Sequence, residues 1–405
     1  MRVLLVNAFH YLRGGVERTY FDEARWLTAA GHEVAHLATQ DARNLPSPTA
    51  HLFAPAVDFG EQVPAGAAPW RWSRVLWSRP AAAAMRRVIA EFKPDLAHFH
   101  APSRYLTPAV LRPLEKAGVP VVMTLHDFKP WCTNRVFFAR GAPCERCKGG
   151  RHVHALIEGC VQGSRVKSAA GMIEAYLHDA LHAYRAVRLW IAPSCFVRDK
   201  AIEHGLSPAR LRVLSHGVER VGGGAPTEVP EGAYALYAGR LAVEKGVRLL
   251  PGIAARIAPT PLVVAGDGPL WSEIEEASRR VPNLRPLGFR GDHELPALRR
   301  NAAAVVVPSL FYETFCYAAA EAMLDARPVA AARIGAVPEL IEHEVTGLLA
   351  TPGDGDALGA ALKRALTEPA ATRWAVAGRA RIQSMGDPKR HLEGLLTIYR
   401  EAMGA

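Results

Sequence analysis

The chain has 405 residues, of which 49% are hydrophobic and 22% are charged, and its formal net charge is +10. This composition excludes a disordered chain, and the length favours two domains over a single core. The sequence has no apolar run near the ~20 residues of a membrane-spanning helix, and the short run after Met1 is typical of a buried strand rather than a signal peptide. We therefore expect a cytoplasmic protein whose positive charge suits an anionic ligand or surface.

The first half alternates between predicted strands and helices. The run RVLLVN at 2–7 predicts a strand that leads into the glycine pair Gly14-Gly15. Apolar residues at helical spacing then predict a helix that ends at Gly31. Further strands are predicted at 32–38, 95–99, 119–124 and 188–192, and a helix is predicted near 80–92.

The second half repeats this alternation. A strand at 234–239 ends in glycine and is followed by a loop and a helix near 246–257. The remaining predicted elements are strands at 261–265, 304–307 and 328–331 and helices at 270–280 and from Phe315 onward. Strands that alternate with helices predict an α/β protein with parallel sheets covered on both faces.

The composition changes sharply at Gly222-Gly223-Gly224, which predicts a flexible linker between two domains. We expect an N-terminal domain at 1–221 with a Cys-rich insertion at about 128–165, a C-terminal domain at 222–385 and a final helix within 386–405. Open parallel sheets bind ligands at the carboxyl ends of their strands, so the reactive cleft is expected between the domains.

Two cations follow the first strand of the second half. Arg240 comes directly after Gly239, and Lys245 lies in the same loop. An arginine fork and a lysine point charge together suit a diphosphate. A solvated surface loop would show the same residues, so the pair gains meaning only from its neighbours.

Two acidic residues follow the strand at 304–307. Glu313 lies in a loop, and Glu321 is the one acidic residue of a nearly apolar helix. A buried carboxylate needs hydrogen-bond donors, and either a ribose diol of a ligand or a structural arginine could supply them. The amides around Thr314, Phe315 and Cys316, at the predicted helix start, offer donors to an anion.

The pair Glu313–x7–Glu321, preceded by Gly239-Arg240-Leu241 and Glu244-Lys245-Gly246, resembles the signature of the retaining glycosyltransferases of family 4. The likeness extends to the first half through Gly14-Gly15 and His126-Asp127. It implies the GT-B fold, with two Rossmann-like doubly wound domains facing across a cleft and a final helix that packs back on the first domain. Further motifs match in the family's order: Gly266-Asp267-Gly268-Pro269, Gly288-Phe289-Arg290, Ile334-Gly335-Ala336-Val337-Pro338-Glu339-Leu340 and Thr346-Gly347-Leu348-Leu349.

The resemblance implies roles for the donor-side residues. Arg240 and Lys245 would hold the donor diphosphate and stabilise the leaving group, with Gly239 beside them. Glu321 would bind the ribose hydroxyls, and Glu313 would contact the transferred sugar. The amides of Thr314, Phe315 and Cys316 would complete the donor site, and the backbone near Phe289 and Arg290 would frame the base.

On the other domain, the resemblance places His126 at the sugar and lets Gly14 and Gly15 approach the phosphates or the acceptor through bare backbone. Two departures concern the identity of the sugar. Cys316 stands where the family commonly has glycine, and Ser215-His216-Gly217 replaces the usual Asn-Gly. The implied reaction is transfer with retention from a UDP- or GDP-sugar to a glycan or lipid-linked acceptor, in cell-surface polysaccharide biosynthesis and without a catalytic cofactor.

Four cysteines form the pattern Cys132–x11–Cys144–x2–Cys147–x12–Cys160 in the insertion. The spacing predicts a four-thiolate structural zinc site, in which His152 or His154 could replace one cysteine, with an iron–sulfur cluster or redox or unligated thiols as alternatives. Some family members carry a similar insertion after the His-Asp step. A cytoplasmic setting disfavours disulfides.

Tryptophan and arginine alternate from Trp70 to Arg79. The stretch fits either the packed edge of a helix or contact with an anionic membrane surface, which would place the protein at the inner face of the membrane. Two other functions compete with sugar transfer. A zinc-containing nucleic-acid-binding protein would fit the charge but leaves Glu321 unexplained, and a GT-B epimerase or phosphorylase lacks an assignable pattern. We therefore expect no nucleic-acid partner.

Overall fold

The computed structural model describes residues 1–56, 76–220, 222, 232–291 and 293–404. The chain divides into two compact units. Unit 1 comprises Met1–Phe137, Glu145–Ser215 and Lys389–Ala405, and unit 2 comprises Phe138–Cys144 and His216–Pro388. The main crossing between units thus falls at Ser215, a few residues before the predicted glycine linker. Trp70, Trp72, Arg71 and Arg74 of the basic aromatic stretch lie outside the described residues.

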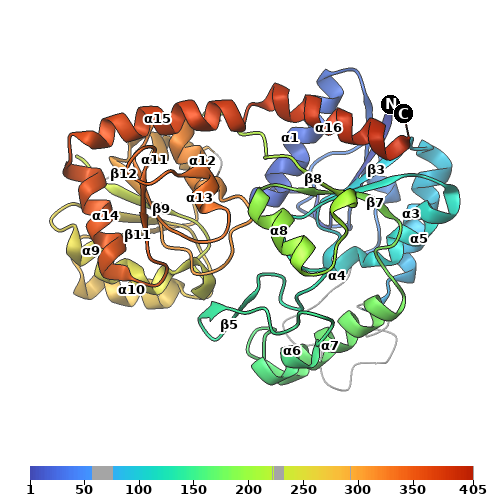
Figure 1. Cartoon of the computed structure of the whole chain (residues 1–405), viewed down its shortest axis with the longest axis horizontal. Helices are drawn as coiled ribbons and strands as arrows, with labels where there is room; N and C mark the ends of the chain where they lie inside the picture. Colours follow the sequence, from blue (N-terminus) through green and yellow to red (C-terminus); the bar gives the residue numbers. More distant parts are fainter. Residues whose placement is uncertain (57–75, 221, 223–231, 292, 405) are drawn as a thin grey trace. The chain divides into compact units, whose positions relative to one another are not determined.

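Unit 1 is built on a six-stranded parallel sheet with strand order β2-β1-β3-β4-β7-β8 (Figure 1). Its strands are β1 (Arg2–Val6), β2 (Glu33–Leu37), β3 (Leu96–Phe99), β4 (Val121–Thr124), β7 (Val187–Ala192) and β8 (Leu211–Val213). Its helices are α1 (Gly15–Ala29), α3 (Arg79–Phe92), α4 (Ser103–Leu106), α5 (Leu111–Ala117), α6 (Val153–Glu158), α7 (Arg165–Ala180), α8 (Cys195–Glu203) and α16 (Pro388–Met403). Strands β3 and β4 are buried along their whole length, as continuous apolar runs require.

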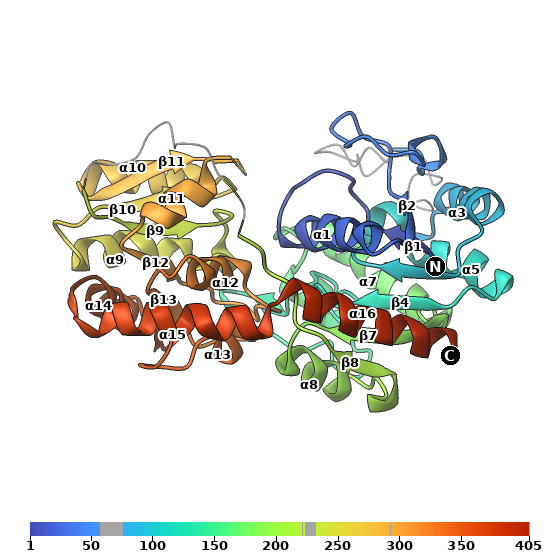
Figure 2. The same ribbon diagram turned by 90° about the horizontal axis from the view of Figure 1, so that it is seen from above.

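Helix α16, from the end of the chain, completes the core of unit 1. Its Leu395 and Tyr399 are fully buried and pack in one cluster with Val3 and Leu5 of β1 and Tyr20 of α1. Figure 2 shows α16 running along the unit 1 sheet. The helix is therefore an integral part of unit 1.

Unit 2 repeats the architecture with a parallel sheet of order β11-β10-β9-β12-β13-β14. Its strands are β9 (Ala235–Ala238), β10 (Leu262–Ala265), β11 (Leu284–Gly288), β12 (Ala304–Val307), β13 (Val329–Ala332) and β14 (Leu348–Ala350), with a separate hairpin of β5 (Phe138–Ala139) and β6 (Ala142–Pro143). Its helices are α9 (Leu250–Arg256), α10 (Trp271–Arg280), α11 (Leu295–Asn301), α12 (Tyr317–Leu324), α13 (Val337–Leu340), α14 (Gly355–Thr367) and α15 (Ala370–Met385). Along β9, Tyr237 packs in one core cluster and Leu236 in another, because successive side chains point to opposite faces of the sheet. Helices cover both faces.

Two predicted helices begin later than the sequence indicated. The helix predicted near 246–257 begins only at Leu250, after two short 3₁₀ turns, because Gly246 adopts a left-handed conformation. The helix predicted from Phe315 begins at Tyr317. Within the described residues, no helix combines the length and hydropathy needed to cross a membrane.

Candidate active site

The loops that carry the predicted donor-side residues all leave the same edge of the unit 2 sheet. Arg240 follows β9, Glu313 follows β12, and Arg290 follows β11. Because these strands are parallel, their carboxyl ends meet at one edge. The structure therefore brings together, at a sheet edge, residues that are up to about seventy positions apart in the sequence.

Lys245 and Glu313 form an ion pair at this edge. The Lys245 Nζ donates to Glu313 Oε1 at 2.8 Å, and Ser309 Oγ donates to the same oxygen at 2.6 Å. The lysine also lies over the Phe311 ring, 4.5 Å from its centroid. Burial lowers the pKa of Lys245, but the facing carboxylate outweighs burial and raises that pKa above its ordinary value. The lysine is therefore cationic at neutral pH and held in one place.

Two glycines fix the loops that carry this pair. Gly246 has φ +70°, and a Cβ there would lie 1.8 Å from the carbonyl oxygen of Pro308. Gly335 has φ +58°, and a Cβ there would lie 2.5 Å from the backbone of Glu313. Both positions combine a left-handed backbone with direct backbone contact, which only glycine tolerates. The placement of Lys245 and Glu313 thus depends on these two close approaches.

Substituting Gly246 by alanine is expected to destabilise the protein by more than about 3 kcal/mol, because the methyl group would overlap the Pro308 carbonyl. Chemical denaturation monitors this loss. Gly252→Ala is the matched control, because that glycine lies in α9 with no atom within 4 Å of its would-be Cβ. The control should gain up to about 1 kcal/mol. Equal destabilisation in both variants would contradict the steric explanation.

Cys316 occupies an unusual backbone position next to the ion pair. It precedes α12 with φ +77°, in the left-handed region that favours glycine. Burial, with a further contribution from Glu313, raises the pKa of its thiol to about 12, so the thiol stays protonated. The helix begins after Cys316, which corrects the expectation that Thr314, Phe315 and Cys316 form the helix start. Phe315 is buried, with its ring 5.1 Å from that of His216.

Glu321 is buried, as predicted, and its partner in the structure is an arginine. Arg299 of α11 donates from Nη1 to Glu321 Oε2 at 2.6 Å and from Nε to Asp325 Oδ2 at 2.8 Å. All three side chains are buried. The structural arginine, one of the two partners considered from the sequence, therefore compensates the burial of Glu321. Burial alone no longer argues for a ribose at this residue.

The remaining donor-side residues lie at the surface of the same edge. Arg240 is exposed, and its carbonyl oxygen accepts a hydrogen bond from the Tyr237 hydroxyl at 2.8 Å. Gly239 and Arg290 are partly exposed, and the Phe289 side chain between the glycine turn and Arg290 is 72% exposed. Phe289 belongs to the Gly288-Phe289-Arg290 motif of the sequence, which implied a role for its backbone and none for its exposed ring. It is a flat apolar surface at the end of β11.

In unit 1, His126 follows β4 and lines a hollow of about 430 Å³, part of it open to solvent. Burial lowers the pKa of His126 to about 4, so the ring is neutral at pH 7 and suited to hydrogen bonding rather than to carrying charge. Asp127 pairs with Arg135 at 2.8 Å, and Lys129 pairs with Glu174 at 2.8 Å. The charged side chains that line this hollow are therefore neutralised in pairs.

Gly14 and Gly15 lie at the start of α1. Gly14 has φ 176°, an extended conformation open to any residue, and a Cβ there would meet no atom within 4 Å. The fold itself thus gives no steric reason for glycine at position 14. A close approach by a ligand, as expected from the sequence, would supply one.

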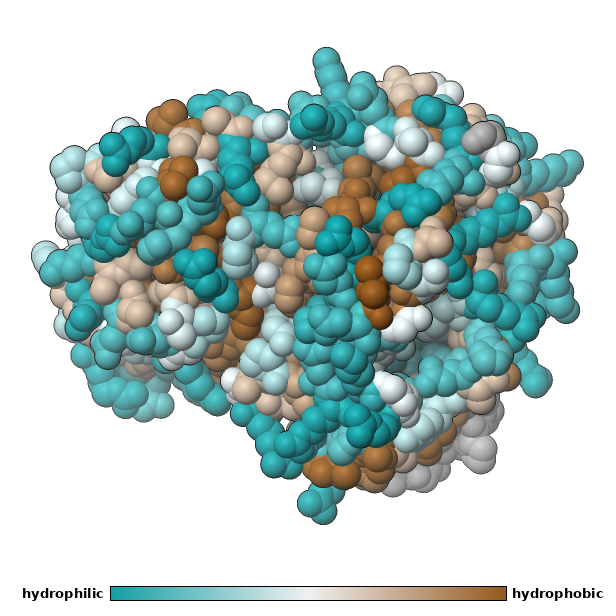
Figure 3. All heavy atoms as spheres, viewed as in Figure 1, coloured by the Kyte–Doolittle hydropathy of each residue, from teal (hydrophilic) through white to brown (hydrophobic). Residues whose placement is uncertain are grey.

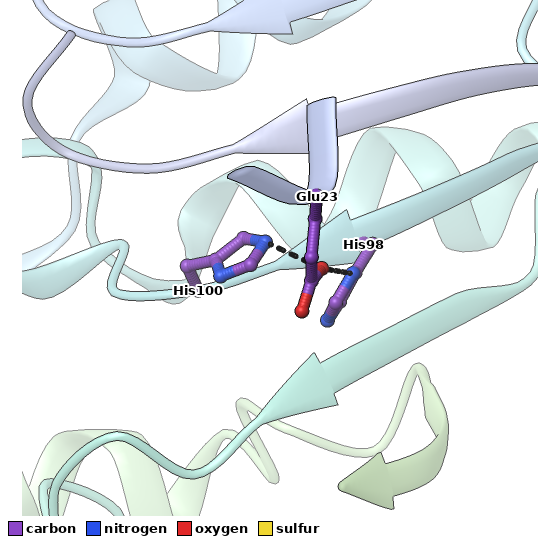
Figure 4. A group of neighbouring side chains, drawn as sticks. All are labelled: Glu23, His98 and His100. Carbon is purple, nitrogen blue, oxygen red and sulfur yellow. Dashed lines mark ion pairs between the residues drawn. The ribbon is translucent and has the colours of Figure 1, made fainter. Parts of the chain in front are cut away.

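A buried network connects His126 to α1 and α16. His126 Nε2 lies 3.0 Å from His100 Nδ1, and Glu23 Oε2 lies 3.5 Å from His100 Nε2 and 3.2 Å from His98 Nδ1 (Figure 4). The other oxygen of Glu23 pairs with His391 Nε2 at 3.0 Å. Interaction with Glu23 raises the pKa of His391 against the effect of burial, and the surrounding histidines keep the pKa of Glu23 well below its ordinary value in spite of burial.

Glu23, His98 and His100 are also the one group in the described part of the chain with three potential metal-ligand atoms within 4.8 Å of one another. The nitrogens of His98 already contact the hydroxyls of Tyr399 and Thr124, each at 2.8 Å. His98 is therefore already hydrogen-bonded at both ring nitrogens, and Glu23 Oε2 lies at ion-pair distance from His98 and His100. Sequence reasoning missed this group, although His98 in β3 and His100 directly after the strand are two residues apart, which places both rings on one face of the sheet.

The four cysteines of the insertion do not form such a group among the described residues. Cys132 is buried, and its thiol donates to Asn134 Oδ1 at 2.8 Å, while Cys144, Cys147 and Cys160 are partly exposed. The zinc site stays a prediction from the spacing, which metal analysis of protein purified without chelator tests.

Two parallel-sheet units with loops gathered at the carboxyl ends of the strands are the architecture of the GT-B class. The sequence model described as Glycosyltransferase Family 4 matches residues 13–220, and the one described as Glycosyl transferases group 1 matches residues 232–368. The chain belongs to glycosyltransferase family 4. The resemblance inferred from the motifs and the predicted fold class are both confirmed.

Individual relatives agree with this assignment. The chain is 28% identical to a glycogen synthase of Mycobacterium tuberculosis over 99% of its own length and 95% of the relative's. It is 30% identical to the 2-deoxystreptamine glucosyltransferase of Streptomyces kanamyceticus over 62% of this chain and 63% of the relative. Among solved structures, Alr3699/HepE of Anabaena with UDP and glucose shares the fold with a TM-score of 0.72 at 18% identity, covering 99% of this chain and 100% of that one.

Proposed function

We propose that this glycosyltransferase moves a sugar from a nucleoside diphosphate donor to a glycan or lipid-linked acceptor with retention of anomeric configuration, in the synthesis of cell-surface polysaccharides. The observation that carries the proposal is the Lys245–Glu313 pair, held at 2.8 Å at the carboxyl edge of the unit 2 sheet. In this proposal, Lys245 exchanges its ion-pair partner when the donor binds. A diphosphate can replace the carboxylate as the partner of Lys245, and Glu313 is then available to sugar hydroxyls.

The main electrostatic requirement of the reaction is to stabilise the negative charge that develops on the leaving diphosphate. The bond between the anomeric carbon and the diphosphate oxygen breaks, and its electron pair goes to the diphosphate. Lys245 and Arg240 would stabilise this charge, because cations oriented in advance stabilise a transition state without reorganisation. The acceptor hydroxyl would attack from the face that the diphosphate leaves and pass its proton to a diphosphate oxygen.

Several residues have supporting roles in this proposal. Glu321 keeps its assignment to the ribose hydroxyls, since a carboxylate has further lone pairs beside the one that accepts from Arg299. Phe289 and the backbone at Arg290 would frame the base. On unit 1, the neutral His126 would hydrogen-bond a hydroxyl of the sugar, and Gly14 and Gly15 would admit the phosphates or the acceptor.

Two further observations bear on the nucleotide and the acceptor. The Anabaena neighbour was solved with UDP and with UDP-glucose, which favours a uridine donor over a guanosine donor. The charge pairs around the hollow at His126 leave its wall without excess charge, and this suits an uncharged, hydroxyl-rich acceptor. A lipid-linked acceptor would bring the enzyme to the inner face of the membrane.

Two measurements test the proposal. Thermal-shift screening against a panel of nucleotide sugars should select a UDP-sugar, because a ligand that binds only the folded state raises its stability. NMR of the product then reads the anomeric configuration, and we expect the configuration of the donor to be retained. An inverted product would contradict the same-face mechanism, and hydrolysis without transfer to any glycan would contradict the acceptor class.

A further inference from the structure

Helix α7 buries small or polar residues and exposes apolar ones. An ordinary surface helix buries an apolar stripe and exposes a polar one. The residues that α7 buries are instead small or polar: Ser168, Gly171, Glu174 and His178. Its outer face carries Val166, Ile173 and Tyr176, whose side chains are 60, 52 and 42% exposed. Packing among the described residues of unit 1 does not explain this apolar outer stripe.

Helix α6 extends the same surface. Its Val153 and Ile157, one helical turn apart, are 43 and 54% exposed. The backbone N–H of Val153 donates to the Tyr176 hydroxyl at 3.2 Å, which joins the two helices at this face. We call the side chains of Val153, Ile157, Val166, Ile173 and Tyr176 the α6–α7 apolar face. Figure 3 shows hydrophobic side chains gathered over α6 and α7.

Basic side chains border this face. Arg165 and Lys167 flank Val166 in the first turn of α7, and Arg151 lies just before α6; all three are exposed. Two acidic residues of the hairpin that α6 and α7 form are turned inward. Glu158 and Glu174 expose only 3 and 2% of their side chains.

The inward acids are also neutralised, by Arg146 and Lys129 respectively. Asp179 is the exposed acid of the hairpin, and it pairs with His152 at 2.7 Å. The border of the α6–α7 apolar face is therefore positive, in a chain whose formal net charge is +10.

We infer that the α6–α7 apolar face docks unit 1 on an anionic lipid surface. An apolar stripe bordered by Lys and Arg is the arrangement of helices that lie in the plane of a membrane interface. The apolar side chains enter the acyl boundary, and the basic side chains meet the lipid phosphates. A protein partner would equally cover the apolar side chains, but the one-sided positive border favours an anionic surface. This docking does not depend on the transfer reaction.

Cosedimentation of the full chain with vesicles tests the inference. We expect binding to vesicles of phosphatidylcholine with one quarter phosphatidylglycerol, and much weaker binding to pure phosphatidylcholine or in 0.5 M salt. Val166→Glu with Ile173→Glu should weaken binding by at least roughly tenfold, because two anchors become anionic. Arg165→Gln with Lys167→Gln should weaken it by roughly 25-fold, because each basic side chain near an anionic surface contributes about fivefold.

Val376→Glu is the matched control, since Val376 is 61% exposed on α15 of unit 2. This variant should bind vesicles as the unmodified chain does. All variants change exposed side chains, so their melting temperatures should stay unchanged. Equal binding by the Val166/Ile173 variant and the control would overturn the inference. Failure of the unmodified chain to bind anionic vesicles would also overturn it. The same holds if the chain does not bind vesicles but forms a dimer that the Val166/Ile173 variant abolishes. Transfer to a soluble acceptor should be the same in all variants, so failed docking and failed catalysis remain distinguishable.

Discussion

Replacing Lys245 by alanine is expected to lower kcat by roughly 100- to 1000-fold, the usual effect of removing one preorganised group that stabilises developing charge. Lys245 is cationic and held 2.8 Å from Glu313 before any donor binds. Its charge would act mainly on the diphosphate as the bond to the sugar breaks. The loss should therefore appear in kcat more than in KM, measured with the donor that the thermal-shift screen selects.

Stability must be separated from catalysis in this experiment. Lys245→Ala leaves the buried Glu313 carboxylate with the Ser309 hydroxyl but without the cation that now neutralises it, so some loss of stability is expected as well. Lys245→Ala with Glu313→Gln removes the unpaired charge and should restore the melting temperature without restoring kcat. Arg248→Ala is the matched control, because Arg248 is three residues away in an exposed pair with Glu273. A Lys245→Ala enzyme with unchanged kcat would exclude the lysine from catalysis.

Replacing Arg299 by methionine is expected to destabilise the protein by about 3–5 kcal/mol, as removal of one partner from a buried ionic group does. The substitution would leave Glu321 and Asp325 buried without the guanidinium that now bridges them. Chemical denaturation measures the loss. Arg280→Met is the control: its pair with Glu276 is 70 and 64% exposed, and the change should cost less than about 0.5 kcal/mol.

Glu321→Gln then distinguishes the two roles of this carboxylate. If Glu321 also binds the ribose, the amide variant should raise the donor KM by roughly tenfold or more, the effect of weakening a hydrogen bond to a charged group. Arg299 keeps Asp325 as its partner in that variant, so the stability should fall less than in Arg299→Met. An unchanged donor KM would leave Glu321 with the structural role alone.

The sequence was informative wherever a local pattern decides the structure. The apolar run at 304–307 and the strand at 121–124 are visible because strands buried on both faces need continuous apolar residues. Strand β11 was missed because LRPLG contains a proline and a charged residue, and β8 because it has only three residues. The start of α12 shifted because Cys316 adopts a positive φ, which no propensity for cysteine predicts.

The motifs of the candidate site could be predicted from the sequence, but the contacts between its side chains could not. The order of the motifs identified the family because each glycine and charge occurs at its own spacing. Arg299 lies on a separate helix, and no local pattern in the sequence connects it with Glu321. Glu23, His100 and His391 belong to three distant segments, so only tertiary packing brings them together.

The burial of α16 in unit 1 has a consequence for synthesis of the protein on the ribosome. The core around β1 needs Leu395 and Tyr399, and the buried Glu23 needs His391, all of which are translated after the segment that forms unit 2. Unit 2, whose segment from His216 to Pro388 is continuous, can assemble while the chain is still being made. The part of unit 1 that is made first must therefore wait for α16, and the apolar residues that α16 covers stay available to chaperones until this helix has been made.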